Sequence, residues 1–120
     1  MSKTVNVIIS DEYLSVSFDV ADPKIMEIGN KMNEICDEAY MNGYNWEAFF
    51  NAYLAANAPE ILDVIESDPE AEMYSAYIEE VNDETRALAQ KFGQLIEDLF
   101  ENEEKILDFV KENAEDIEWD

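Results

Sequence analysis

The fold is indicated by an alternating run near the N-terminus, Leu14-Ser15-Val16-Ser17-Phe18-Asp19-Val20. Every second side chain in this run is apolar, which is the period of a β-strand with one buried face. An earlier run rich in β-branched residues, Thr4-Val5-Asn6-Val7-Ile8-Ile9, is also typical of a strand. The polar segment Ser10-Asp11-Glu12 between them predicts a turn, so the two runs are predicted to form an antiparallel hairpin.

After the hairpin the apolar period becomes that of an α-helix. Asp22 and Pro23 provide a cap and a first-turn proline for a helix that is predicted to end near Asn42-Gly43. Asn45 is predicted to cap a second, unusually aromatic helix. Pro59 is predicted to begin a short third helix.

The second half of the chain adds one strand and more helix. The run Met73-Tyr74-Ser75-Ala76-Tyr77-Ile78 predicts a third strand that joins the hairpin. A strong amphipathic helix is predicted from Asp83, with a break at Asn102 before the apolar stripe continues. We therefore expect an α+β fold with a small antiparallel three-stranded sheet, the hairpin plus one later strand, covered by four to five helices. Because no repeat or linker divides the chain, residues 1–120 are expected to form a single domain.

Charge is the most unusual property of the sequence. Thirty Asp and Glu residues stand against seven Lys and Arg, a formal charge of -23 at pH 7. This composition excludes nucleic acid and anionic membranes as direct partners, because phosphate binding needs basic side chains. Residues 37–82 contain eleven acids and no base, so ion pairs within that segment cannot neutralise it. A solvated acidic face is the plain interpretation, but part of this field is predicted to face a basic partner protein.

Catalytic and cofactor chemistry finds little support. The chain has no histidine, the commonest general base and metal ligand. Its three glycines are too far apart to form a phosphate-binding loop, and the single cysteine, Cys36, is predicted to be a core thiol. We therefore expect no enzyme activity, no cofactor and no specific metal site. The lack of a membrane-length apolar run and of a signal peptide predicts a cytoplasmic protein.

Candidate partner-binding residues come from two features of the base-free segment. Tyr44 and Trp46, at the turn entering the second helix, are aromatic residues that are expected to keep an exposed edge. A group of acids is expected to surround a turn between the third helix and the third strand. The predicted partner-binding residues are Tyr44, Trp46, Asp63, Glu66, Asp68, Glu70 and Glu72. The rival acidic patch, which we expect to be a solvated helix face and a frayed tail, comprises Glu101, Glu103, Glu104, Glu115, Asp116 and Glu118.

The middle of the chain resembles a known family. The residues that carry the resemblance are Asn42-Gly43-Tyr44-Asn45-Trp46-Glu47, Phe49, Phe50, Tyr53, Leu54, Pro59, Asp68-Pro69-Glu70-Ala71, Met73-Tyr74 and Ala76-Tyr77. This pattern is similar to that of the Immunity protein 51 family, except that Asn45 replaces the usual aspartate and Glu72 the usual glycine. The family is associated with bacterial polymorphic toxin and contact-dependent inhibition systems. The resemblance implies a small cytosolic protein that binds and blocks a cognate toxin domain, and it assigns no catalytic residues.

These observations predict an immunity protein that neutralises a basic toxin domain, with a nuclease as one option suggested by charge alone. Blockade of the active cleft is the favoured mechanism, with allosteric inhibition left open. An acidic DNA mimic that inhibits many DNA-binding proteins is the alternative, and an enzyme with paired carboxylates is a weaker third. The chain is expected to be a monomer or a weak homodimer.

Overall fold

The structure is a computed structural model that describes residues 5–119. Four strands and five helices follow one another along this part of the chain. They are β1 (Val5–Ile9), β2 (Leu14–Asp19), α1 (Pro23–Ile35), α2 (Gly43–Asn57), α3 (Pro59–Leu62), β3 (Glu66–Ser67), β4 (Met73–Ile78), α4 (Asp83–Glu101) and α5 (Glu103–Asn113). The α+β class and the number of helices agree with the prediction.

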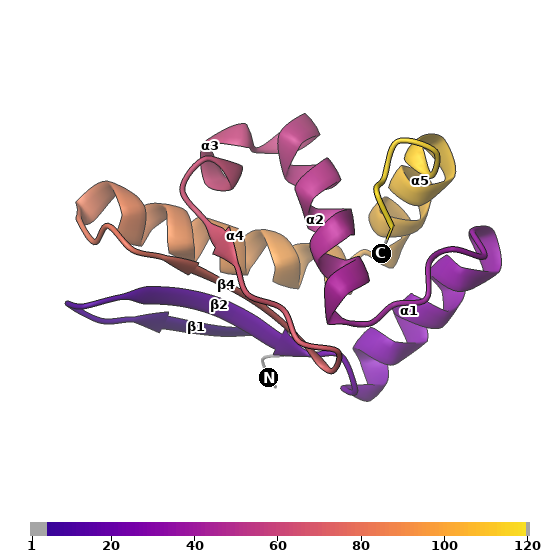
Figure 1. The fold of residues 1–120 in the computed structure, drawn as a ribbon, viewed down its shortest axis with the longest axis horizontal. Helices are drawn as coiled ribbons and strands as arrows, with labels where there is room; N and C mark the ends of the chain where they lie inside the picture. Colours follow the sequence, from indigo (N-terminus) through magenta and orange to yellow (C-terminus); the bar gives the residue numbers. More distant parts are fainter. Residues whose placement is uncertain (1–4, 120) are drawn as a thin grey trace.

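The sheet is antiparallel throughout, in the order β1-β2-β4-β3. The predicted hairpin is confirmed, with Val7 opposite Val16, and β4 pairs with β2 so that Phe18 lies opposite Tyr74. The helices lie on one side of the sheet, with α2 and α4 directly against it, and no helix among residues 5–119 covers the other side (Figure 1). This bare face carries the alternate side chains of β2 and β4, including Ser15, Ser17 and Ser75.

The expectation of three strands is wrong by one. The fourth strand, β3, pairs with β4 through only two residues, Glu66 opposite Tyr77 and Ser67 opposite Ala76. Two polar residues show no apolar alternation, so the sequence pattern alone gives no signal for them. The strand exists because the chain after α3 runs back alongside β4.

The boundary between the first two helices also differs from the prediction. The first helix, α1, ends at Ile35, and a loop leads to Asn42, which caps α2 by accepting a hydrogen bond from the Asn45 N–H at 2.9 Å. Asn45 is therefore not the cap. Its side chain is buried and donates to the carbonyl of Tyr40 at 2.7 Å, which holds the loop against the first turn of α2. Cys36, the first residue after α1, is half-buried and packs against the core.

Most other helix ends follow the sequence signals. The side chain of Asp22 accepts from the backbone N–H groups of Lys24 and Ile25 at the start of α1. Asn82 and Thr85 form a reciprocal capping box at the start of α4, with both hydrogen bonds at 2.9 Å. The predicted break at Asn102 is confirmed, because α4 ends at Glu101 and α5 begins at Glu103.

The core is an aromatic cluster between the sheet and the helices. Phe18 on β2 contacts Trp46 on α2 and Phe100 on α4, with ring centroids 5.5 Å and 5.2 Å apart. Phe18 also stacks on Tyr74 of β4 at 5.2 Å, and Phe50 packs on Tyr74 at 5.1 Å. Edge-to-face and offset contacts of this kind stabilise a core by about 0.5–1.5 kcal/mol per pair beyond area burial. The cluster fixes α2 over the sheet and so positions the segments that flank it.

Candidate partner-binding surface

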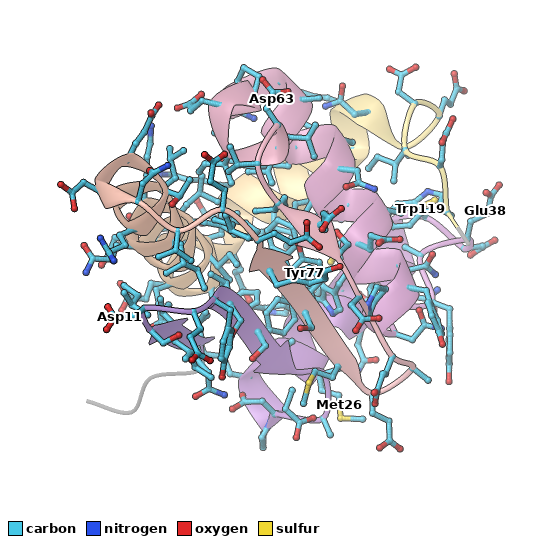
Figure 2. All side chains as sticks on the ribbon, turned by 60° about the vertical axis from the view of Figure 1, so that its left-hand side comes forward. Asp11, Met26, Glu38, Asp63, Tyr77 and Trp119 are labelled. Carbon is cyan, nitrogen blue, oxygen red and sulfur yellow. The ribbon has the colours of Figure 1, made fainter. Side chains whose placement is uncertain are left out.

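Five exposed acids form a strip along one edge of the sheet. This acidic strip comprises Asp63, Glu66, Asp68, Glu70 and Glu72, and every member is exposed. The strip starts at the end of α3, follows β3 and reaches the turn before β4, and Figure 2 labels Asp63 at its α3 end. Within residues 5–119 none of the five takes part in an ion pair. The acids are therefore spread along an edge, whereas the sequence predicted a group around one turn.

The backbone of the strip is held firmly although its carboxylates face solvent. The N–H of Asp68 donates to the carbonyl of Ser75 at 2.8 Å, and Glu70 pairs with Met73 through two backbone hydrogen bonds of 2.8 Å and 3.2 Å. The carbonyl of Glu72 accepts from the N–H of Val20 at 2.9 Å. These bonds limit the conformational freedom of the backbone from which the carboxylates of Asp68, Glu70 and Glu72 extend, so less backbone entropy is lost when a partner binds.

Tyr77 connects the strip to the bare face of the sheet. It lies opposite Glu66 in the β3–β4 pair, and the charge of the Glu66 carboxylate, followed by a hydrogen bond to it, raises the pKa of the Tyr77 hydroxyl. Figure 2 labels Tyr77 on β4. The Tyr77 ring and the Glu66 carboxylate therefore lie together, an arrangement that suits contact with a guanidinium or ammonium group.

Gly43 joins the two segments that carry the family-like residues. Its N–H donates to the carbonyl of Ala71 at 3.0 Å. A Cβ atom at Gly43 would lie 1.8 Å from the carbonyl oxygen of Glu70 and 2.3 Å from that of Met73. The start of α2 and the turn before β4 are therefore in direct backbone contact, and only glycine leaves room for this approach.

The two predicted aromatic residues have different environments. Tyr44 is 41% exposed and is available to a partner. Trp46 is 0% exposed and packs against Phe18 and Phe49, so the expectation of an exposed edge is wrong. Because α2 begins at Gly43, Trp46 is the fourth residue of the helix and does not lie at the turn that enters it.

Exposed apolar side chains beside the strip were missed by the sequence reasoning. Tyr40 is 73% exposed and Met73 is 41% exposed. The sequence pattern places Tyr40 in the first predicted helix and Met73 at the start of a predicted strand. Neither position is therefore predicted to contribute to a partner-binding surface. The base-free composition around them is the one signal that marks this region.

Two hollows border the region. The first, of about 360 Å³, lies between α1 and the turn before β4, and its lining includes Met26, Asn30, Asn33, Tyr40 and Glu72. The second, of about 430 Å³, lies between the first half of α2 and the C-terminal segment. We call it the aromatic hollow, and its lining includes Tyr44, Glu47, Asp116, Glu118 and Trp119. Rings and carboxylates together give it the chemistry to receive a basic side chain.

The segments described above lie within a match to a known protein family. A family model described as Immunity protein 51 matches residues 6–115. The chain belongs to the Immunity protein 51 family. The match extends well beyond the resemblance at residues 42–77 and covers every helix and strand, except the first residue of β1. No curated protein and no solved structure matches the chain.

Membership of the Immunity protein 51 family identifies the chain as an immunity protein and implies a protein partner, the cognate toxin. Among residues 5–119, no three or more His, Cys, Asp or Glu side chains are grouped so that they could hold a metal ion. Over the same residues, no helix is both long enough and apolar enough to cross a bilayer.

The rival acidic patch of this Immunity protein 51 member is not a frayed tail. Glu103 accepts a hydrogen bond from Lys31 at 2.6 Å, which ties the start of α5 to α1. Ile117 is buried, and Trp119 packs against the core. Residues 114–119 are therefore docked on the protein, and Asp116 and Glu118 face the aromatic hollow.

Proposed function

We propose that residues 1–120 act as one immunity domain that binds its cognate toxin in the cytoplasm and neutralises it without catalysing a reaction. The observation that carries this proposal is the family match over residues 6–115. The acidic strip and the exposed aromatic side chains around it support a partner that is itself a protein with a basic surface.

Electrostatic attraction is the first part of the mechanism. The five carboxylates of the acidic strip are part of a formal charge of -23, so a basic toxin is attracted before contact. Steering of this kind raises association rates toward about 10⁸–10⁹ per molar per second at low ionic strength. Fast capture suits a protein that must act before the toxin meets its substrate.

Aromatic anchors are the second part. Tyr44 lies beside the aromatic hollow, and Tyr77 lies beside Glu66 in the acidic strip. A toxin Arg or Lys at either point gains a ring face and a carboxylate together, a combination that is common at binding hot spots. A protein bound over these anchors would cover the basic cleft of the toxin and exclude its substrate.

Co-expression tests the proposal directly. The chain should restore growth of cells that express the C-terminal toxin domain encoded by the gene immediately upstream, while toxin domains of unrelated families remain lethal. Rescue against many unrelated DNA-binding toxins would favour the DNA mimic, because a mimic recognises a shared ligand and not one partner. Failure to rescue against the neighbouring toxin, with the protein well expressed, would overturn the proposal.

A further inference from the structure

The two edges of the sheet are built differently. The β3 edge is two residues long and lies within the acidic strip. A short edge strand and charged side chains both protect a sheet edge from unwanted pairing. The β1 edge has five residues, and none of them is charged. Val7 and Ile9 are each 38% exposed and Ile8 is 45% exposed. Within residues 5–119 no strand pairs with the outer side of β1, so this apolar edge of a very acidic protein is a candidate docking strand.

Backbone geometry shows which groups of β1 are available. In antiparallel pairs the N–H groups alternate between pointing at the partner strand and pointing away. The N–H of Ser10 donates to the carbonyl of Tyr13 at 3.1 Å, whereas that of Val5 points outward and donates to Glu97 Oε1 at 2.9 Å. The same alternation directs the N–H and C=O groups of Val7 and Ile9 away from β2. No side chain in residues 5–119 accepts a hydrogen bond from either N–H.

We infer that the β1 edge binds an extended segment of the cognate toxin as an added strand, an inference that rests on the proposed function. The backbone of this segment pairs with Val7 and Ile9. Its apolar side chains cover Ile8 on one face and the exposed parts of Val7 and Ile9 on the other. A basic residue at one end of the segment meets the carboxylate of Glu12 in the turn after β1, beside Asp11, which pairs with Arg86 at 3.7 Å.

Charge selects the toxin over a second copy of this chain as the occupant. Two copies would each bring a formal charge of -23, and long-range repulsion would oppose their pairing. A basic toxin would be attracted by the same charge. The β1 edge and the β3 edge are three strand spacings apart, about 14 Å. One toxin domain can therefore span the bare face, where Ser15, Ser17 and Ser75 are small, and contact both the added-strand edge and the acidic strip.

Amide hydrogen exchange measured by NMR tests the inference on the unmodified protein. Free, the Val7 and Ile9 amides should exchange rapidly, and the Asn6 and Ile8 amides, which point toward β2, should be protected. In the complex with the neighbouring toxin domain, Val7 and Ile9 should become at least tenfold slower. Unchanged exchange at Val7 and Ile9 in a formed complex would overturn the inference and leave the immunity function intact. Concentration-dependent protection in the free chain would also overturn it, because the occupant would be a second copy.

A pair of variants isolates the backbone contribution. Ile9→Pro removes the outward backbone N–H without removing a hydrogen bond to β2. Ile9→Val keeps that backbone N–H and has a side chain of similar size to proline. We expect at least a tenfold higher Kd for Ile9→Pro and less than a threefold change for Ile9→Val, with circular dichroism confirming that both fold. Equal affinities for the two folded variants would overturn the inference. If no complex forms with the unmodified chain, the proposed function itself fails.

Discussion

Gly43→Ala probes the backbone contact between α2 and the turn before β4. The added methyl group would lie 1.8 Å from one carbonyl oxygen and 2.3 Å from another, and both obstacles are backbone atoms that no rotamer change can move. Gly43 does not have a positive φ, so the substitution tests space and not backbone strain.

The expected cost follows from three contributions. Overpacking costs about 1–3 kcal/mol, and the backbone obstacles favour the upper end of that range. Weakening of the Gly43–Ala71 hydrogen bond adds about 1 kcal/mol. The higher helix propensity of alanine offsets about 1 kcal/mol. The free energy of unfolding should therefore fall by about 2–3 kcal/mol, which for 120 residues lowers Tm by about 10 °C.

Gly93→Ala is the matched control. It also introduces a methyl group into a helix, but the nearest atom is Cγ2 of Val7 at 2.4 Å, the end of a partly exposed side chain that can rotate. Urea and thermal unfolding followed by circular dichroism should give a loss at Gly43 at least twice that at Gly93. If Gly43→Ala unfolds at the temperature of the unmodified protein, or if Gly93→Ala is the more damaging change, the close approach described for Gly43 is wrong.

Three further predictions concern the acidic strip and the core. Changing Glu66, Asp68, Glu70 and Glu72 to Gln or Asn should slow toxin association about tenfold at low salt and flatten its salt dependence. Four amide changes at exposed acids outside the acidic strip and the aromatic hollow, Glu101, Glu104, Glu112 and Glu115, should do much less. Stopped-flow binding that shows the larger effect for the second set would contradict this. Burial raises the pKa of the Tyr74 hydroxyl, with a hydrogen bond to Ser67 opposing it. Because the pKa of Tyr74 is higher in the folded state, the stability that depends on its neutral hydroxyl is complete below the unfolded pKa near 10 and is lost as pH rises above it. Urea midpoints of Tyr74→Phe should therefore fall less steeply between pH 9 and pH 11 than those of the unmodified protein. Parallel falls would refute this. Trp46→Phe should lower the free energy of unfolding by about 1–2 kcal/mol and Trp46→Ala by about 4 kcal/mol. The buried Trp46 Nε1 has no hydrogen-bond partner within residues 5–119, so its loss adds no hydrogen-bond penalty in either variant. Equal urea midpoints for the two variants would contradict this prediction.

Local patterns predicted the elements whose signals lie within a few residues. The alternation from Leu14 to Val20 predicted β2, and Asn82 with Thr85 lies at the predicted start of α4. The start of α2 could not be chosen in this way, because Asn42 and Asn45 are both good caps and lie three residues apart. The choice depends on tertiary contacts, namely the hydrogen bond from Gly43 to Ala71 and the burial of the Asn45 side chain.

The candidate surface was predictable in charge but not in shape. A run of acids without a base predicts exposed carboxylates, and all five members of the acidic strip are exposed. Their path along an edge depends on the pairing of Glu66 with Tyr77, which a two-residue strand does not encode locally. Trp46 was misassigned because α2 is apolar around most of its circumference, so its period could not indicate which face turns inward.

The aromatic core cannot close until most of the chain has been synthesised. Phe18 contacts Phe100, so residues separated by most of the chain must meet before the core closes. Translation at about 5–20 residues per second needs about 4–16 s to pass from one ring to the other. During that interval the hairpin has no complete core to pack on, and the nascent chain cannot present a finished surface. Protection therefore depends on molecules that were completed before the toxin arrives, and a cell that begins synthesis only at that moment starts several seconds late.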